Sequence, residues 1–137
     1  MSTGQKVLLS GIQPSGRPHL GNYFGAMKQF VALQDQYKSL IMIADYHALT
    51  SITDPDLLRQ YIVDLAIDYL AIGLDPAKTT IFRQSAVPEH TELAWIFDCL
   101  TTVPYLQRAH AYKDAVAKGR EAHAGLLTYP MLMAADI

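Results

Sequence analysis

The sequence predicts an α/β fold, with a Rossmann-like parallel sheet and helices on both of its faces. Short, continuous apolar runs alternate along the chain with longer segments in which apolar residues recur every three or four positions. Strands that read as continuous apolar runs are typical of parallel sheets, because helices cover both faces of such a sheet. The 137 residues, half of them hydrophobic, suit one domain with a sizeable core.

Three apolar runs are predicted as strands, namely residues 6–10 (KVLLS), 40–44 (LIMIA) and 79–83 (TTIFR). Because a helical segment separates each run from the next, successive strands are predicted to be parallel and joined by right-handed crossovers. Ligands of open parallel sheets bind beyond the carboxyl ends of the strands. A binding site is therefore expected in the segments that follow the three runs.

Three segments are predicted as helices, over residues 20–37, 55–72 and 89–101, with a further helix from residue 104. The second has the clearest end signals. Asp54 is a favourable N-cap, and Pro55 suits the first helical position. Gly73 is typical of the residue that follows a helix.

Composition excludes several classes of protein. A net charge of about −2 gives no sign of a nucleic-acid-binding protein, although a local basic patch would still be possible. The single cysteine, Cys99, has no internal disulfide partner, and it is expected to be a buried, reduced thiol in a cytosolic protein. No apolar run is long enough to span a membrane, and the histidines show no metal-ligand spacing, so neither a membrane span nor a metal site is expected. The apolar segment at Ile137 predicts that the chain is the N-terminal piece of a longer protein.

The segment after the first predicted strand, residues 10–23 (SGIQPSGRPHLGNY), is unusually rich in glycine and proline. Glycines let a backbone approach a ligand closely, and the N-terminus of the following helix favours a phosphate. A P-loop does not fit, because Arg17 replaces its lysine and Pro18 replaces its hydroxyl residue. The dinucleotide pattern G-x-G-x-x-G is also absent. The segment indicates another kind of nucleotide loop, or a tight turn before a capped helix.

Three side chains near the C-terminus share one predicted helix face. Tyr129, Met133 and Asp136 are spaced i, i+4 and i+7. A carboxylate among apolar neighbours is costly unless a donor bonds to it. An indole N–H is such a donor, and its ring could pack on Tyr129 and Met133. Pro130 indicates that the helix begins there or is kinked.

Four strings together resemble class I tryptophanyl-tRNA synthetases. They are SGIQPSGRPHLGNYFGA (10–26), ADYHALT (44–50), GLDP (73–76) and AGLLTYPMLMAADI (124–137). Within the first string, PHLGN is similar to the "HIGH" motif of that class. The strings span nearly the whole chain, and the two long ones are specific.

The resemblance implies a site for ATP, with Mg²⁺, and a site for L-tryptophan. The implied ATP-binding residues are Gln13, Pro14, Ser15, His19, Gly21, Asn22 and Lys113. The implied tryptophan-binding residues are Gly11, Gln13, His47, Tyr129, Met133 and Asp136, with Asp136 accepting from the indole. Gly21 would leave room for the nucleotide, and His47, in the loop after the second strand, would lie near the amino acid. Asp45 is expected to be structural.

One segment departs from the family pattern. Bacterial members carry a lysine-rich M-T-Q-F-K-x-K run in a mobile loop where this chain has AHAYKDAVAKG at 109–119. Lys113 aligns with the first lysine, and Ala115 stands in place of the second. The phosphate-binding lysine is therefore Lys113 or Lys118, or it is absent. Without the resemblance, this segment reads as a solvated turn.

The resemblance implies that residues 1–137 are the N-terminal part of a synthetase catalytic domain. The full-length enzyme would be a cytoplasmic homodimer that activates tryptophan with ATP and charges tRNA(Trp). The chain lacks a K-M-S-K-S loop and an anticodon-binding domain, so alone it is expected to be inactive or weakly active. Two alternatives remain open: a tyrosyl-specific sister enzyme, because a phenol can also donate to Asp136, and a stand-alone nucleotide-binding module.

Overall fold

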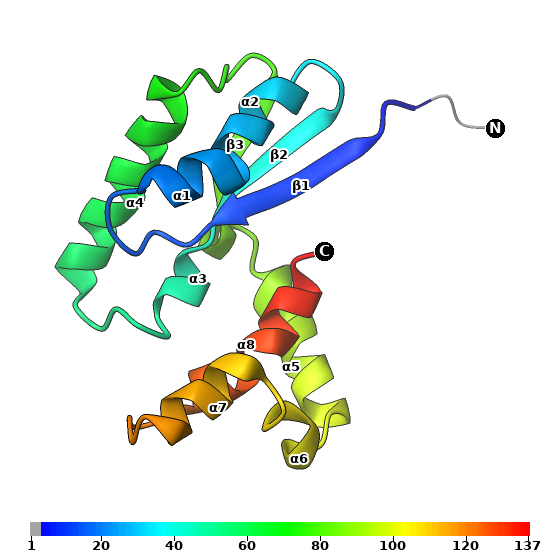
Figure 1. Ribbon diagram of the computed structural model, residues 1–137. Coiled ribbons are helices and arrows are strands. Elements are labelled where there is room, and N and C mark those ends of the chain that lie inside the picture. Colours follow the sequence, from blue (N-terminus) through cyan, green and yellow to red (C-terminus); the bar gives the residue numbers. More distant parts are fainter. Residues whose placement is uncertain (1–3) are drawn as a thin grey trace. The chain divides into compact units, whose positions relative to one another are not determined.

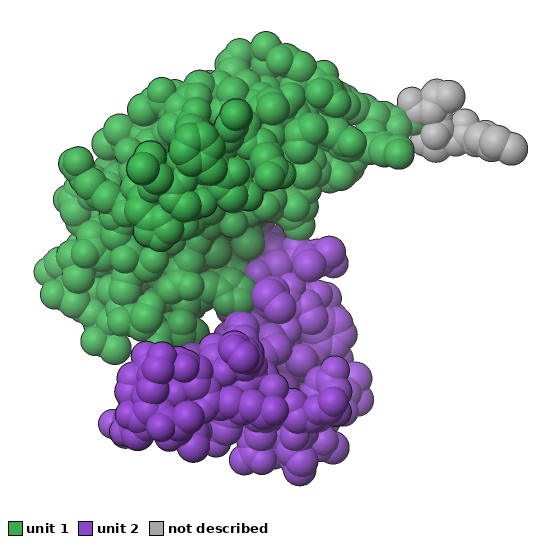
Figure 2. Space-filling model, viewed as in Figure 1, with its two compact units in different colours: residues 1–86 green, residues 87–137 purple. Residues whose placement is uncertain are grey.

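The computed structural model describes residues 4–137, which fall into two compact units. Unit 1 covers residues 1–86 and unit 2 covers residues 87–137 (Figure 2). Unit 1 contains the strands, and the part of unit 2 that follows Val87 is helical. Each unit has its own set of packed elements and is described by itself.

Unit 1 is built on a three-stranded parallel sheet (Figure 1). Its strands are β1 (Val7–Ile12), β2 (Lys38–Ile43) and β3 (Thr79–Arg83), in the spatial order β1-β2-β3. Met42 of β2 pairs with Gly11 of β1 and with Phe82 of β3. The predicted parallel Rossmann-like sheet is therefore confirmed, although β1 runs two residues further than the apolar run alone indicates.

Helical segments connect these strands. The first connection contains α1 (Leu20–Asn22), a π-helical turn (Tyr23–Met27) and α2 (Lys28–Leu33). The second contains α3 (Asp45–Ala48) and the long α4 (Pro55–Ala71). The predicted cap of α4 is confirmed, because the Asp54 carboxylate accepts from the N–H groups of Asp56 and Leu57 at 2.9 and 3.1 Å. Gly73 follows this helix with a φ of 103°, a left-handed conformation that glycine adopts without strain.

One hydrophobic core fills unit 1. Its buried members are Met27, Phe30, Ile41, Ile43, Leu65, Tyr69 and Leu74. Ile41 and Ile43 lie two positions apart on β2 and so point to the same face of the sheet. Residues of α2 and α4 reach that same face, where the rings of Phe30 and Tyr69 meet edge to face with centroids 6.3 Å apart. Two right-handed crossovers that run in one direction place both helices there.

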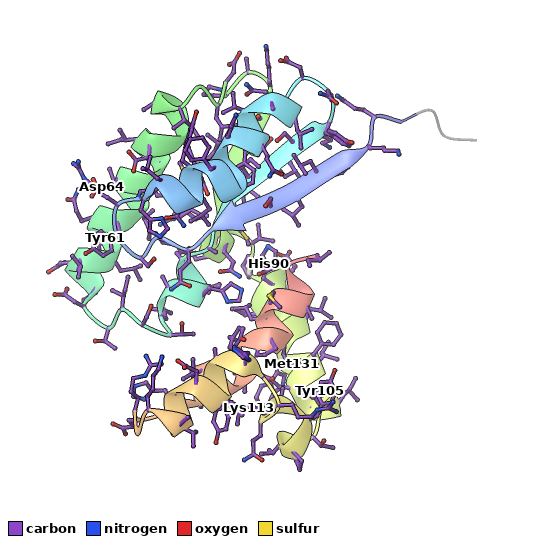
Figure 3. All side chains as sticks on the ribbon, in the orientation of Figure 1. Tyr61, Asp64, His90, Tyr105, Lys113 and Met131 are labelled. Atoms are coloured by element: carbon purple, nitrogen blue, oxygen red, sulfur yellow. The ribbon has the colours of Figure 1, made fainter. Side chains whose placement is uncertain are left out.

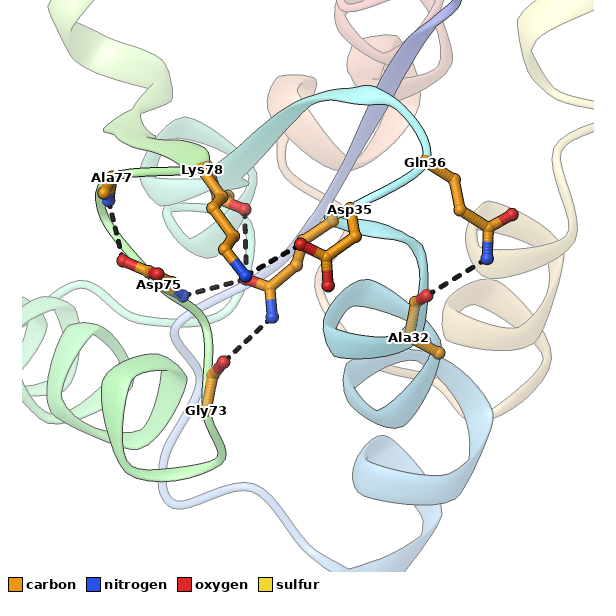
Figure 4. A network of polar contacts seen from close by, with 9 residues as sticks. Ala32, Asp35, Gln36, Gly73, Asp75, Ala77 and Lys78 are labelled. Carbon is orange, nitrogen blue, oxygen red and sulfur yellow. Dashed lines mark hydrogen bonds and ion pairs between the residues drawn. The ribbon is translucent and has the colours of Figure 1, made fainter.

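A buried amide joins the end of α2 to the start of β3 (Figure 4). The Gln34 amide group donates to the Gly73 carbonyl at 3.1 Å, and its oxygen accepts from the Asp75 N–H at 2.9 Å and the Thr79 hydroxyl at 3.5 Å. Beside it, Lys78 forms an exposed ion pair with Asp35 at 2.8 Å. The network lies at the amino ends of β2 and β3, whereas a ligand is expected at the carboxyl ends of the strands.

Unit 2 is a cluster of four helices: α5 (Glu89–Leu100), α6 (Val103–Leu106), α7 (His110–Ala117) and α8 (Ala124–Ala135). Helix α8 packs against each of the other three and most extensively against α5. The predicted helices over 89–101 and from residue 104 are confirmed, within a residue or two. Cys99, on α5, is exposed, so its expected burial is wrong. Helix α8 begins at Ala124 and carries Pro130 inside it, so it does not begin at the proline.

The segment 109–119 differs from its expected form as a solvated turn or mobile loop. It forms α7, which ends at Ala117 and is followed by the C-cap Lys118 and by Gly119, whose φ is 64°. Ala115 is buried in this helix, and alanines favour the helical state. Across residues 4–137, none of the helices combines the length and apolar character that crossing a membrane requires.

Candidate functional site

His19 caps the first helix beyond the carboxyl end of β1. Its Nδ1 accepts from the backbone N–H groups of Gly21 at 3.0 Å and Asn22 at 3.3 Å. In return, the Asn22 side-chain oxygen accepts from the His19 backbone N–H at 3.0 Å. This reciprocal capping box satisfies N–H groups that a helix otherwise leaves unpaired. His19, Gly21 and Asn22, which were predicted as one site, are thus brought together.

The capping box determines which polar atoms remain to meet a ligand. Because Nδ1 of His19 accepts, the neutral imidazole carries its proton on Nε2, which is therefore a donor. The oxygen of Asn22 is used in the box, so its amide nitrogen is the group that can donate outward. His19 is an exposed residue. Two donors on one exposed loop suit an anionic ligand.

Gly21 is required by His19 itself. A Cβ atom at position 21 would lie 2.8 Å from Cε1 and 2.9 Å from Nδ1 of the His19 ring. The ring could escape that contact only by leaving the cap. The predicted reason for Gly21, room for a nucleotide, stays a prediction, and the structure adds a reason within the protein.

The loop before this cap is held in place by its own contacts. Gln13 donates to the Ser51 hydroxyl at 3.0 Å, Pro14 is buried, and the Ser15 N–H donates to the Gln13 carbonyl at 2.9 Å. Gly16 has a φ of 125°, which L side chains rarely adopt. The loop therefore has one well-defined course between β1 and α1.

Gly11 lies inside β1, where it touches β2. A Cβ atom here would be 2.4 Å from the carbonyl oxygen and 2.9 Å from the Cβ of Met42, its partner in the sheet. The absence of a side chain at this position is needed for strand packing. A role for Gly11 toward tryptophan stays a prediction.

His47 was predicted to lie in a loop after the second strand, but it lies in the short helix α3. Helix α3 begins directly after β2, and the buried side-chain oxygen of Gln84 accepts from the backbone N–H groups of Tyr46 at 3.1 Å and His47 at 3.3 Å. These two bonds satisfy free N–H groups at the start of α3. They also tie the carboxyl end of β2 to that of β3, which Gln84 follows.

Asp45 is structural, as predicted. Its buried carboxylate accepts from the backbone N–H of Ser85 at 2.9 Å and from the Ser85 hydroxyl at 2.5 Å. A buried carboxylate needs such partners. With Gln84, it forms a second bridge between the ends of β2 and β3, on which His47 is positioned.

In unit 2, the Asp136 carboxylate is buried at the end of α8, and its side chain is only 8% exposed. His90, in the first turn of α5, approaches it with Nδ1 3.0 Å from Oδ1 (His90 is labelled in Figure 3). Because a carboxylate is an acceptor, the imidazole N–H donates. The prediction that Asp136 needs a hydrogen-bond donor is thus confirmed, and the protein supplies one donor itself.

The other two predicted members of this face differ in exposure. Tyr129 is half-buried in α8, whereas Met133 is 51% exposed. Asp136 continues the helical backbone just beyond the end of α8, with φ −74° and ψ −17°. Helical spacing therefore keeps the three residues on one side of the helix.

The two candidate lysines differ in their partners. Lys118 forms an ion pair with Asp114 at 2.8 Å, and Arg120 binds the same carboxylate at 2.8 Å. Both cations hold the pKa of the Asp114 carboxyl below its usual range, with the hydrogen bond from Lys118 as the main cause. Lys113 is exposed on α7 (Figure 3) and forms no ion pair with any residue in 4–137.

Two residues were missed by sequence reasoning alone. Gln84 and His90 both lie in the segment that follows β3, which was expected to border a site as a strand-end segment. Their roles depend on partners that are distant in sequence, namely α3 for Gln84 and Asp136 for His90. Within residues 4–137, no group of three or more His, Cys, Asp or Glu side chains could hold a metal ion.

Comparison with known proteins agrees with this architecture. The tryptophan–tRNA ligase of Fusobacterium nucleatum is 61% identical over 132 residues, which are 96% of this chain and 41% of that protein. A crystal structure of the Campylobacter jejuni tryptophanyl-tRNA synthetase complexed with ADP and tryptophan matches with a TM-score of 0.87 and 49% identity, over 96% of this chain and 41% of that one.

A more distant match shows the fold alone. The tyrosyl-tRNA synthetase of Archaeoglobus fulgidus superposes with a TM-score of 0.81 at 20% identity, over 98% of this chain and 44% of that one. The chain thus spans about two fifths of the length of these relatives. The family described as class I tRNA synthetases (W and Y) matches residues 1–137, and the chain belongs to that family.

Proposed function

We propose that the protein containing this chain activates L-tryptophan with ATP and transfers it to tRNA(Trp). The observation that carries the proposal is the capping box of His19 and Asn22, which leaves two hydrogen-bond donors beyond the end of β1. Relatives named tryptophan–tRNA ligase at up to 61% identity support it, as does the relative that binds ADP and tryptophan. The chain alone is expected to be inactive or weakly active.

In the proposed reaction, the tryptophan carboxylate attacks the α-phosphorus of ATP. A new bond forms between the carboxylate oxygen and phosphorus, and the bond to the bridging oxygen breaks, so that pyrophosphate leaves with its electron pair. Nε2–H of His19 and the amide of Asn22 would donate to oxygens that gain negative charge in this step. No protein nucleophile is needed, because holding both substrates in line supplies most of the rate.

The remaining loop residues would complete the ATP site. Gln13, Pro14 and Ser15 form the backbone course that leads to His19, and Gly21 keeps the imidazole in its cap. Lys113 is the better candidate for a phosphate-binding lysine, because Lys118 is already paired with Asp114. Mg²⁺ would arrive on the phosphates of ATP, where magnesium commonly binds.

Tryptophan would be recognised through its indole. Asp136 would accept from the indole N–H, while Tyr129 and Met133 would pack against the ring. We also assign Gly11, Gln13 and His47 to the amino-acid site, on the family resemblance. A homodimer in the cytoplasm is part of the same proposal.

The test is ATP–pyrophosphate exchange with the full-length protein. Exchange that depends on tryptophan and not on tyrosine supports the proposal. Exchange that depends on tyrosine would favour the tyrosyl-specific alternative. Nucleotide binding without exchange for either amino acid would favour the binding-module alternative and overturn the proposed reaction.

A further inference from the structure

We propose that His90 is a positioning residue for tryptophan recognition, which orients the Asp136 carboxylate toward the indole N–H. The inference rests on the proposed function of Asp136. It adds a residue that lies on another helix and that no family motif quoted above contains. Its starting point is the 3.0 Å contact between His90 Nδ1 and Asp136 Oδ1.

The position of Asp136 is electrostatically unfavourable for a carboxylate. It caps the C-terminal end of α8, where the carbonyl groups of the helix carry partial negative charge. The side chain is also 8% exposed, so little water solvates it. A carboxylate in such a place needs compensating donors.

Helix α5 supplies that compensation from across the unit. His90 lies in its first turn, and its imidazole N–H donates to the carboxylate. The charged side chains on that turn are Glu89 and Glu92, both of which are exposed. Of the side chains on this turn, His90 is the one that contacts the Asp136 carboxylate, at 3.0 Å.

The contact with His90 restrains one oxygen of the Asp136 carboxylate. His90 is only 11% exposed, so its ring has little freedom to turn away. A carboxylate has two oxygens and about four acceptor sites, so the bond from His90 to Oδ1 does not by itself use up its capacity to accept. A bond to an ionised acceptor is strongest when the acceptor is held in place before the ligand arrives.

Two substitutions separate positioning from packing. His90→Asn keeps an N–H at the same number of bonds from the backbone as Nδ1, and His90→Leu keeps similar volume without a donor. His90→Met, which also lacks a donor and has a more adaptable side chain, replaces the leucine variant if that variant does not fold. His123→Leu changes an exposed histidine at the start of α8 and serves as the control.

The experiment compares two amino acids in ATP–pyrophosphate exchange by the full-length protein. One is tryptophan, and the other is its analogue in which sulfur replaces the indole N–H. The ratio of their kcat/KM values measures recognition of the N–H. We expect His90→Leu to lower this ratio about tenfold or more, through a higher KM for tryptophan, because bonds to charged groups contribute strongly. The KM for ATP should stay within about twofold of the unsubstituted value, as expected of a change that alters only the contact to the indole.

Restoration of the ratio by His90→Asn, with an unchanged ratio in His123→Leu, supports the inference. An equal loss for both amino acids in His90→Leu would show that His90 only supports packing and would overturn it. Failure of the proposed function would look different. In that case, the unsubstituted protein would show no tryptophan-dependent exchange, or no preference for tryptophan over the sulfur analogue.

Discussion

Gly21 and the ring of His19 occupy adjoining space, so that a Cβ atom on the glycine would lie 2.8 Å from Cε1 of the imidazole. The histidine is held there by the hydrogen bonds that cap α1. The glycine is therefore part of the device that fixes the tautomer of His19. Any side chain at position 21 competes with the cap.

Gly21→Ala should impair use of ATP. The methyl group would push the imidazole out of its cap, and the Nε2–H donor would lose its fixed direction. We expect kcat/KM for ATP to fall about tenfold or more, since a misdirected donor loses much of its value in the transition state. Gly25→Ala is the matched control, because a Cβ at that position meets nothing within 4 Å. Full activity of Gly21→Ala in pyrophosphate exchange would contradict this account of the loop.

Gln34→Leu should destabilise unit 1, whereas Asp35→Asn should not. The first change leaves the Gly73 carbonyl and the Asp75 N–H without their partner, at a cost of about 1–3 kcal/mol. The second removes an ion pair between exposed side chains, which water and salt already weaken. Urea denaturation of both variants checks the contrast. Equal shifts of the midpoint would show that the buried amide has no special role.

Lys113→Ala should weaken ATP use more than Lys118→Ala. The Lys118 ammonium is committed to Asp114, while Lys113 extends from α7 without an ion pair in residues 4–137. We expect Lys113→Ala to raise the KM for ATP, or lower kcat, by about tenfold, the effect of losing one charge-assisted contact. Steady-state exchange rates at varied ATP measure this. A larger effect from Lys118→Ala would reverse the assignment.

Tyr69→Phe should change how stability depends on alkaline pH. Burial raises the pKa of the Tyr69 hydroxyl well above the usual value of 10.0. Above pH 10 the unfolded chain releases this proton while the folded chain keeps it, so stability falls as pH rises, by up to about 1.4 kcal/mol per pH unit. Below pH 10, Tyr69 is protonated in both the folded and the unfolded chain, so this loss of stability is absent.

The Tyr69→Phe variant has no hydroxyl at this position, so it lacks the loss of stability that this group causes above pH 10. Near neutral pH it should be less stable, by about 1 kcal/mol, because the hydroxyl donates to the Met42 carbonyl at 3.3 Å. The difference between the two proteins should shrink above pH 10 and then reverse. Denaturation curves from pH 8 to pH 11.5 test this, with Tyr105→Phe at an exposed position as the control. A constant difference across that range would contradict the prediction.

Local signals in the sequence were enough to predict much of the fold. Helix α4 begins after its cap Asp54 and ends before Gly73. Each of these two ends depends only on residues within about one helical turn of it, so propensity and spacing identify both. The strand over residues 79–83 is a short apolar run and was predicted with its observed bounds. The segment 109–119 was misjudged, because its helix depends on burying Ala115 against other parts of unit 2.

The sequence by itself determined that a glycine- and proline-rich loop around His19 follows the first strand and that Asp136, a carboxylate among apolar neighbours, requires a donor. Only the tertiary structure decided the partners, such as His90 for Asp136 and Gln84 for the start of α3. Hydrogen bonds act over about 3 Å, and a pair distant in sequence comes that close only after the helices and strands have packed. The demand for a partner is a property of the residue, but its identity is a property of the fold.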